Sequence, residues 1–163
     1  MVKILTLGDV APDFTAVAVG GDYGDGQTVR LADFRGRKLV LYFYPKDDTP
    51  GCTTQACDLR DRYAHLLDHG AVVFGVSVDS PASHRKFIDK HSLPFPLLSD
   101  ENHEMVGAYG VWVEKNLYGK TYMGTERSTF VIRPDGTIKA IFRKVKPGEH
   151  AESLLNDLAN FEP

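Results

Sequence analysis

The chain has 163 residues and a mass of 18.1 kDa, a size typical of one domain, so we expect a single domain over residues 1–163. Its 19 Lys and Arg residues against 22 Asp and Glu residues leave a formal charge of −3, which argues against nucleic acid or an anionic membrane as the main partner. Apolar runs such as 39–44 and 71–76 are far shorter than the ~20 residues of a membrane-spanning helix, and the first residues do not resemble a signal peptide. With two cysteines and no disulfide scaffold, we expect a soluble, cytoplasmic protein with a thiol-based role.

The first third of the chain predicts three strands. Residues 12–19 and 27–31 have the composition of short strands joined by the glycine-rich segment 20–26. Residues 38–44 form a continuous apolar run with aromatic side chains, which is typical of a strand buried on both faces. This strand is expected to end before Pro45.

The middle of the chain alternates helical and strand patterns. From Thr53 to His69 apolar residues recur at helical spacing, and Gly70 can adopt a left-handed cap. Residues 71–78 predict a second buried strand. Residues 80–90 predict a helix, with a serine at the N-cap and a proline in the first turn.

The last third predicts a helix, a hairpin and a terminal helix. The ranges are 101–109 for the first helix, 127–133 and 137–143 for strands joined by a turn at 134–136, and 149–161 for the last helix. Buried strands that alternate with helices, followed by an antiparallel hairpin, indicate an α/β fold. We therefore expect a mixed central sheet flanked by helices on both faces.

Cys52 follows Pro50 and Gly51 at the start of the predicted helix from Thr53 to His69. There its sulfur would lie beside backbone N–H groups without helical partners and beside the positive end of the helix dipole, which favours a thiolate. An ordinary thiol is only a few per cent ionised at pH 7, so ionisation alone raises the amount of nucleophile by roughly thirty-fold at most. Faster chemistry therefore requires nearby donors that stabilise a transition state.

Cys57 lies five residues after Cys52, a spacing that differs from the C-x-x-C of thioredoxin-like redox motifs. On an ideal helix the two Cα atoms would be about 8.7 Å apart, whereas a disulfide tolerates about 7 Å. If these cysteines form a disulfide, the first turns of the helix must unwind, which is feasible at a helix end. The spacing alone leaves open that Cys57 is only a small core residue.

The segment from Phe43 to Cys57 carries Pro45, Thr49 and Cys52 in the pattern Pro, three residues, Thr or Ser, two residues, Cys. This pattern resembles the active-site segment of peroxiredoxins. The second cysteine five residues on resembles the Q-type branch, also called bacterioferritin comigratory protein. The likeness runs from about residue 8 to the C-terminus and includes the segments 74–79, 97–100, 109–112 and 127–132.

The resemblance implies a thioredoxin-like fold and a thiol peroxidase that reduces hydrogen peroxide and organic hydroperoxides. By that likeness Cys52 is the peroxidatic cysteine and Cys57 is the resolving cysteine, joined in an intrachain disulfide that thioredoxin or a glutaredoxin-like dithiol reduces. No metal, flavin or haem is required. The C-terminal part has no cysteine for an intersubunit disulfide, so we expect a monomer.

The same resemblance gives roles to three further residues. Arg127 matches the active-site arginine of the family, and its guanidinium would favour the thiolate and hold a peroxide oxygen, unless it is an exposed surface arginine. Thr49 would hydrogen-bond at the sulfur and peroxide, or merely cap a turn. Pro45 would exclude water from the site, or merely end a strand. Gln55 occupies a position that is Glu in many branches, which removes a charge partner for nearby arginines.

Two other functions remain open at this point. The chain could be a disulfide reductase that acts on proteins, although the cysteine spacing and the context of Pro45 and Thr49 argue against it. It could also be a non-catalytic binding or chaperone module whose cysteine acts as a sensor. Four carboxylates around the motif are interpreted as surface charge available for partner docking: Asp47, Asp48, Asp58 and Asp61.

Overall fold

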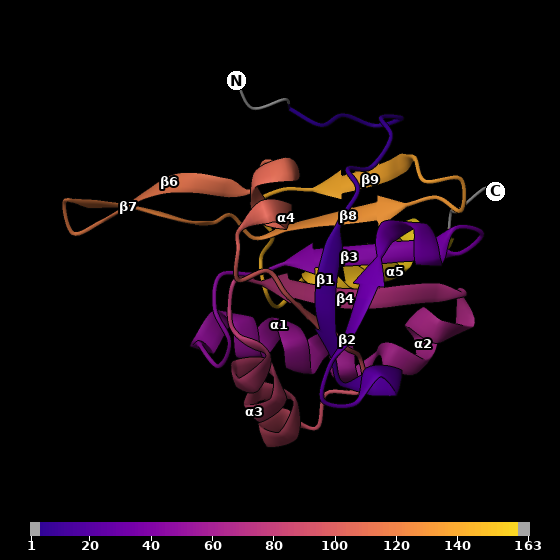
Figure 1. Ribbon diagram of the computed structural model, residues 1–163, viewed down its shortest axis with the longest axis horizontal. Helices are drawn as coiled ribbons and strands as arrows, with labels where there is room; N and C mark the ends of the chain where they lie inside the picture. The colour runs from indigo at the N-terminus through magenta and orange to yellow at the C-terminus, as the bar shows by residue number, and fades with distance from the viewer. Residues whose placement is uncertain (1–3, 160–163) are drawn as a thin grey trace.

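The structure is a computed structural model that describes residues 4–159. Its centre is a mixed seven-stranded sheet in the order β2-β1-β5-β4-β3-β8-β9 (Figure 1). Strands β3, β4 and β5 are parallel, and the other neighbours pair antiparallel. In chain order the strands are β1 (Thr15–Val19), β2 (Gln27–Arg30), β3 (Lys38–Phe43), β4 (Ala71–Ser77), β5 (Leu97–Ser99), β8 (Ser128–Ile132) and β9 (Ile138–Phe142).

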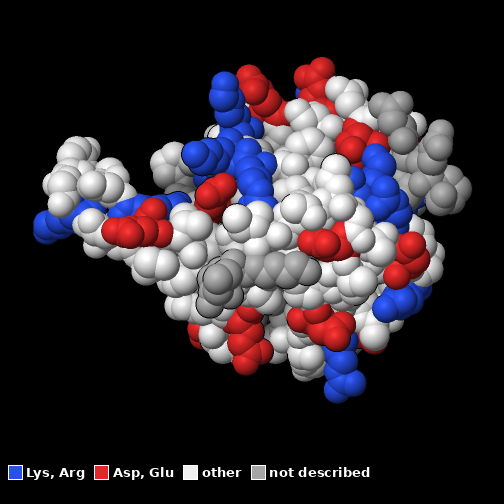
Figure 2. All heavy atoms as spheres, turned by 90° about the horizontal axis from the view of Figure 1, so that it is seen from above, with Lys and Arg blue, Asp and Glu red and all other residues white. Residues whose placement is uncertain are grey.

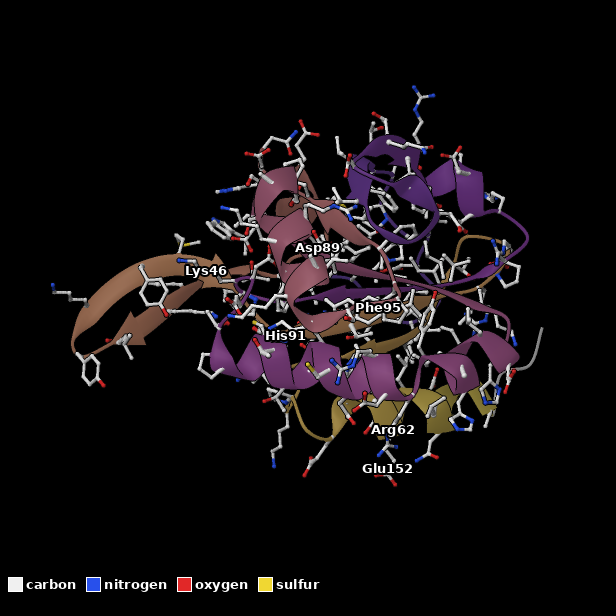
Figure 3. All side chains as sticks on the ribbon, turned by 90° about the horizontal axis from the view of Figure 1, so that it is seen from below. Lys46, Arg62, Asp89, His91, Phe95 and Glu152 are labelled. Carbon is white, nitrogen blue, oxygen red and sulfur yellow. The ribbon has the colours of Figure 1, made fainter. Side chains whose placement is uncertain are left out.

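Helices cover both faces of this sheet, which confirms the predicted fold class. One face packs against α1 (Pro50–Asp61), α2 (Tyr63–Asp68), α3 (Pro81–His91) and α5 (His150–Ala159). The other face packs against α4 (Glu104–Ala108) and the short 3₁₀ turns η1 (Gly21–Tyr23) and η2 (Leu31–Phe34). Side chains of β3 alternate between these layers, with Val40 and Tyr42 toward α1 and Leu41 toward α4. Figure 3 shows α1 running between α3 and α5.

The helix predicted from Thr53 to His69 is two helices in the structure. Helix α1 begins at Pro50, where a residue without an N–H fits the first helical position. It ends at Asp61, and the N–H of the next residue, Arg62, donates to the Leu59 carbonyl at 3.2 Å and closes a tighter turn before α2. Gly70 has a φ of +74°, which confirms the predicted left-handed position after the helix.

At the starts of the next two helices, side chains accept hydrogen bonds from backbone N–H groups. The Ser80 hydroxyl accepts a hydrogen bond from the Ser83 N–H at 3.1 Å, as predicted for the start of α3. Helix α4 starts three residues later than predicted because the Asp100 carboxylate accepts the N–H groups of Met105 and Val106 at 3.0 and 2.9 Å. The helix predicted over 149–161 begins one residue later, at His150. Its residues 160–161 lie outside the described range, and so do both ends of the predicted domain 1–163.

A two-stranded hairpin, β6 (Trp112–Leu117) and β7 (Lys120–Thr125), was missed by the sequence analysis. Most of its side chains are exposed or half-buried, so neither strand has the apolar alternation that periodicity detects. The hairpin projects from the body of the molecule (Figure 1). The face of the molecule that Figure 2 shows carries interspersed acidic and basic side chains. No helix among residues 4–159 is long and apolar enough to cross a membrane.

Two glycines allow a matched test of packing. A Cβ at Gly75 in β4 would lie 2.6 Å from Leu97 Cδ2 and 2.7 Å from Tyr42 Cζ, whereas a Cβ at Gly107 in α4 meets nothing within 4 Å. Gly75→Ala should therefore lower the free energy of unfolding by about 1–3 kcal/mol. Gly107→Ala should raise it by about 0.5–1 kcal/mol, because alanine is the better helix former. Urea unfolding measures both, and equal effects of the two substitutions would contradict this account of the packing.

Candidate active site

The Cys52 thiol lies in the first turn of α1, as predicted, and the residue is 2% exposed. Pro50 has no N–H, and the Thr49 side chain does not cap the helix. By helix geometry the N–H groups of Gly51 and Cys52 have no acceptor within the helix. The sulfur is thus shielded from bulk water, which by itself disfavours a charge, and lies at the positive end of the helix dipole, which favours a negative one.

Arg127 reaches the thiol from the other side, directly before β8. Its Nη2 donates to Cys52 Sγ at 3.4 Å. The register that pairs Phe43 with Ser128 brings the start of β8 beside the end of β3, from which the chain continues to Cys52. A Cβ at Gly51 would lie 3.1 Å from Arg127 Nη2, so the missing side chain leaves room for the guanidinium. Arg127 is therefore half-buried at the thiol rather than exposed on the surface.

Gln55 connects Arg127 to the C-terminal helix. Its Oε1 accepts from Arg127 Nη1 at 2.6 Å, and its Nε2 lies 3.0 Å from His150 Nδ1. His150 Nε2 lies 2.7 Å from the Thr129 hydroxyl. The sequence analysis expected that glutamine at position 55 removes a charge partner for nearby arginines. The Gln55 amide oxygen nevertheless accepts a hydrogen bond from Arg127. His150 and Thr129 were missed, because no spacing or motif links them to Cys52 in the sequence.

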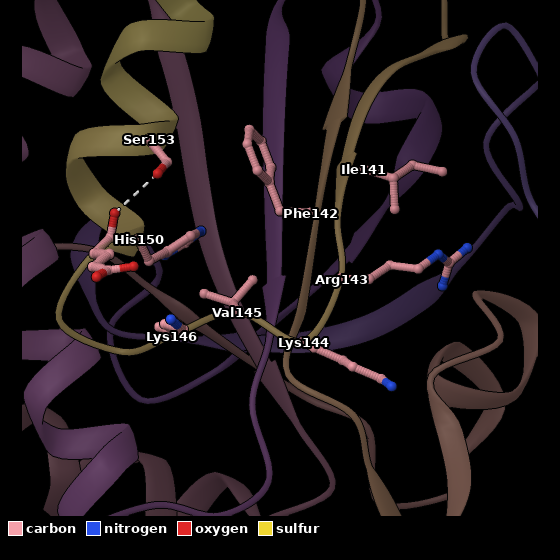
Figure 4. Close-up of a pocket in the computed structure, with 9 residues that line it drawn as sticks. Ile141, Phe142, Arg143, Lys144, Val145, Lys146, His150 and Ser153 are labelled. Atoms are coloured by element: carbon pink, nitrogen blue, oxygen red, sulfur yellow. Dashed lines mark hydrogen bonds between the residues drawn. The ribbon is translucent and has the colours of Figure 1, made fainter.

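Burial controls the ionisation of His150. Loss of solvation, followed by the charge of Arg127, lowers the pKa of His150 from 6.5 to about 4. The imidazole is therefore neutral at neutral pH and can accept a hydrogen bond. On its outer side His150 borders a cavity of about 400 Å³ that is also lined by Arg143, Lys144 and Lys146 (Figure 4).

The loop between β3 and α1 is held by α3 through Asp47. This carboxylate accepts the Tyr44 hydroxyl at 2.5 Å, the Ser83 hydroxyl at 2.8 Å and His84 Nδ1 at 2.7 Å. His84 Nε2 lies 2.9 Å from the Leu98 carbonyl, which can only accept, so this nitrogen is the donor. The backbone N–H of Asp47 donates to Asp79 Oδ2 at 2.8 Å.

The interpretation of Asp47 as surface charge is therefore wrong, because it is 7% exposed and fully engaged in this network. Ligand atoms of Asp47, Asp79 and His84 lie within 4.8 Å of one another, but hydrogen bonds already use them. Asp48 is exposed, as predicted, and contacts Lys90 Nζ at 2.8 Å and His91 Nε2 at 3.2 Å on α3. The other two carboxylates form ion pairs within α1 and at its end: Asp58 with Arg62, and Asp61 with Arg60.

The remaining predicted site residues lie on the same loop and helix. The Thr49 hydroxyl donates to the Lys46 carbonyl at 2.9 Å, which is the turn-forming contact, so its expected role at the sulfur stays a prediction. Pro45 is half-buried and lies in the loop two residues after the end of β3. Cys57 is half-buried within the continuous helix α1, and both cysteines are free thiols. Two Cα atoms five residues apart on a continuous helix are farther apart than a disulfide tolerates, so Cys52 and Cys57 cannot form a disulfide in this conformation.

The chain resembles a consistent set of known proteins. Residues 7–141 match the AhpC/TSA family. Peroxiredoxin Bcp of Bacillus subtilis is 47% identical over 154 residues, which cover 94% of this chain and 95% of that protein. Peroxiredoxin Bcp of Escherichia coli K12 is 44% identical over 152 residues, with 93% and 94% covered. Peroxiredoxin Q of Xanthomonas campestris has a TM-score of 0.83 at 39% identity over 90% of each chain. A PrxQ mutant of Xylella fastidiosa has a TM-score of 0.88 at 34% identity, covering 97% of this chain and 98% of that one.

The chain therefore belongs to the AhpC/TSA family. Within it, the relatives are peroxiredoxins of the Bcp or Q type, so the fold is thioredoxin-like and the protein is a thiol-dependent peroxidase. The predicted resemblance, fold class and enzyme class are thus confirmed. This class favours the peroxidase over the disulfide reductase and the thiol-bearing binding module that the sequence left open.

The buried network of Asp47 should stabilise the fold far more than the exposed pairs of Asp48. Asp47→Ala leaves His84 buried without its carboxylate, so we expect a loss of about 3–5 kcal/mol in the free energy of unfolding. Asp48→Asn is the control one residue away, and it should change stability little because water screens the partners of Asp48 and asparagine tolerates its left-handed backbone, with a φ of +59°. Denaturant unfolding compares the two, and similar losses would show that the buried network is not what holds the loop.

Proposed function

We propose that Cys52 is the peroxidatic cysteine and Cys57 the resolving cysteine of this peroxidase. The observation that supports the first role is the 3.4 Å contact from Arg127 Nη2 to Cys52 Sγ in a buried site at the start of a helix. A fixed cation and helix donors around one sulfur stabilise both a thiolate and the charge that develops on an attacked peroxide oxygen. Thr49 and Pro45 flank this position, with Thr49 bonding the peroxide and Pro45 excluding water.

In the first step the Cys52 thiolate donates an electron pair to one peroxide oxygen and the O–O bond breaks. The other oxygen leaves and takes a proton, so hydrogen peroxide releases water and an organic hydroperoxide releases an alcohol. The sulfur becomes a sulfenic acid, oxidised by two electrons. Structures of the Xanthomonas campestris bacterioferritin comigratory protein include a trapped intermediate and ligand complex from alkyl peroxide reduction, which supports organic hydroperoxides as substrates here.

In the second step the Cys57 sulfur attacks the sulfenic sulfur, the S–O bond breaks and water leaves. Because residues five apart on a helix have Cα atoms about 8.7 Å apart, the first turns of α1 must open before this disulfide forms. Helix ends open at low free energy, so the geometry of the reduced state is compatible with this step.

A dithiol reductant, thioredoxin or a glutaredoxin-like protein, then donates two electrons and restores both thiols by exchange. We propose that the chain works as a monomer, because both sulfurs of the cycle lie on one helix of one chain. A cytoplasmic location suits a cycle that needs free thiols and a disulfide reductant. No metal or organic cofactor and no nucleic-acid or membrane partner is needed for these steps.

Substitution of the two cysteines separates the two steps. Cys52→Ser should abolish peroxide consumption. Cys57→Ser should retain one rapid oxidation per chain but lose turnover with thioredoxin, because no disulfide forms for exchange. Intact mass after one equivalent of hydrogen peroxide and a coupled thioredoxin assay measure both. Wild-type turnover in Cys57→Ser would refute the resolving role.

Substitution of Arg127 tests the contact at the thiol. Arg127→Ala should slow oxidation of Cys52 about 10²- to 10³-fold, because it removes a charged donor from a buried site. Arg35→Ala is a matched control, since Arg35 is exposed after η2 on the opposite side of the sheet. Stopped-flow oxidation of the reduced variants measures the rate constant. Equal effects of the two substitutions would mean that net charge, rather than the contact, is responsible.

A further inference from the structure

We propose that His150 is a positioning residue of the peroxidase, which acts through Gln55 to hold Arg127 on the thiol and to keep the first turns of α1 folded. The three side chains form one continuous hydrogen-bonded chain that ends at Cys52 Sγ. This proposal rests on the proposed roles of the two cysteines. It assigns a function to the start of α5, which lies 98 residues after Cys52 in the sequence.

The direction of every hydrogen bond in the chain follows from Arg127. A guanidinium only donates, so the Gln55 atom at 2.6 Å from Nη1 must be the carbonyl oxygen. The Gln55 amide nitrogen therefore faces His150 and donates to Nδ1 at 3.0 Å. Nδ1 accepts and carries no proton, so the proton is on Nε2, which donates to the Thr129 hydroxyl oxygen at 2.7 Å. Only one neutral tautomer of His150 fits this chain.

The surroundings of His150 keep that tautomer neutral. Gln55 and Thr129 are fully buried and His150 is 2% exposed, so water does not replace these bonds. The titratable or charged groups nearest the ring are Arg127, whose charge opposes protonation, and Tyr42 on β3, whose ring centroid lies 6.1 Å away. The cavity beside His150 is also lined by three basic residues and one acidic residue: Arg143, Lys144, Lys146 and Glu149. Burial raises the pKa of Tyr42 well above 10, so it is neutral as well. Phe142 on β9 supplies the remaining ring contact.

This arrangement explains why an amide serves at position 55. A glutamate would accept from Arg127 equally well but could not donate to His150 Nδ1. His150 would then have to change tautomer or take a proton, and the fixed orientation of the chain would be lost. The glutamine thus matches Arg127 on one side and a neutral histidine on the other.

Because Gln55 lies between Cys52 and Cys57 on α1, the same bonds should affect the two chemical steps in opposite directions. Holding Arg127 on the sulfur speeds attack on the peroxide. Holding Gln55 against α5 opposes the unwinding that brings Cys57 to the oxidised sulfur. Loss of the His150 contact should therefore slow the first step and accelerate the second, a split that a general loss of stability does not produce.

The test compares His150→Phe and His150→Gln in single-turnover reactions with hydrogen peroxide. Phenylalanine fills the site but leaves the Gln55 amide without its acceptor, so oxidation of Cys52 should be about 10- to 100-fold slower and disulfide formation faster. Glutamine offers an oxygen to Gln55 and an N–H to Thr129, so it should restore both rates to within a few-fold of wild type. Rapid quenching followed by intact mass separates the thiol, sulfenic acid and disulfide forms.

The control is Ser153→Ala on the same helix. The Ser153 hydroxyl donates to the Glu149 carbonyl (Figure 4), and neither residue belongs to the hydrogen-bonded chain from His150 to Cys52. It should leave both rates unchanged. Circular dichroism and urea unfolding establish that each variant is folded. A second measurement needs no variant: nitrogen NMR of the wild-type imidazole should show His150 protonated on Nε2 alone at neutral pH.

Three results would overturn the proposal. One is a folded His150→Phe variant with wild-type rates in both steps. Another is equal slowing in His150→Phe and His150→Gln, which would indicate packing rather than hydrogen bonding. The third is a wild-type His150 that carries its proton on Nδ1 or on both nitrogens. If instead the wild-type protein forms no sulfenic acid or disulfide with peroxide, the proposed cysteine roles fail, whereas the tautomer measurement still judges the hydrogen-bonded chain.

Discussion

The contact between the Arg127 guanidinium and the Cys52 sulfur is the interaction on which the rest of the site depends. The two residues are 75 positions apart in the sequence and meet only because β3 and β8 are neighbours in the sheet. Coulombic attraction is stronger in such a buried site than in water, but a buried cation also needs further acceptors. Arg127 meets this need with one arm on the sulfur and the other on Gln55. The chemistry of the thiol is therefore linked to the packing of the whole α1 face.

Two helices on this face hold the site from opposite sides. Helix α5 acts on the arginine through His150 and Gln55, and helix α3 acts on the loop before Cys52 through His84 and Asp47. Both histidines are buried, and each lies between two hydrogen-bonding partners. His150 lies between the Gln55 amide and the Thr129 hydroxyl, whereas His84 lies between the Asp47 carboxylate and the Leu98 carbonyl. Each helix therefore reaches the site through a histidine that is fixed on both sides.

The sequence predicted the parts of the structure that depend on local patterns. The buried strands, the Ser80 cap and the location of Cys52 at a helix start follow from periodicity and from Pro and Gly chemistry. The hairpin β6–β7 was not predictable this way, since its side chains are largely exposed. The burial of Asp47 and the role of His150 depend on partners 37 and 95 residues away, and no local signal carries such pairings. Family likeness identified Arg127 but gave no reason for its orientation.

The two demands on α1 conflict, and the chemistry itself offers a resolution. In the proposed cycle, attack on peroxide needs the first turns folded, with Sγ against Arg127, whereas resolution by Cys57 needs them open. In the proposed attacking state the guanidinium faces a thiolate, and a hydrogen bond to a charged partner is roughly twice as strong as one to a neutral partner. After oxidation to a neutral sulfenic acid, that part of the attraction is lost while the Gln55 chain remains. Opening α1 therefore requires less free energy after the first step than before it, so the helix is held most firmly in the state that attacks peroxide.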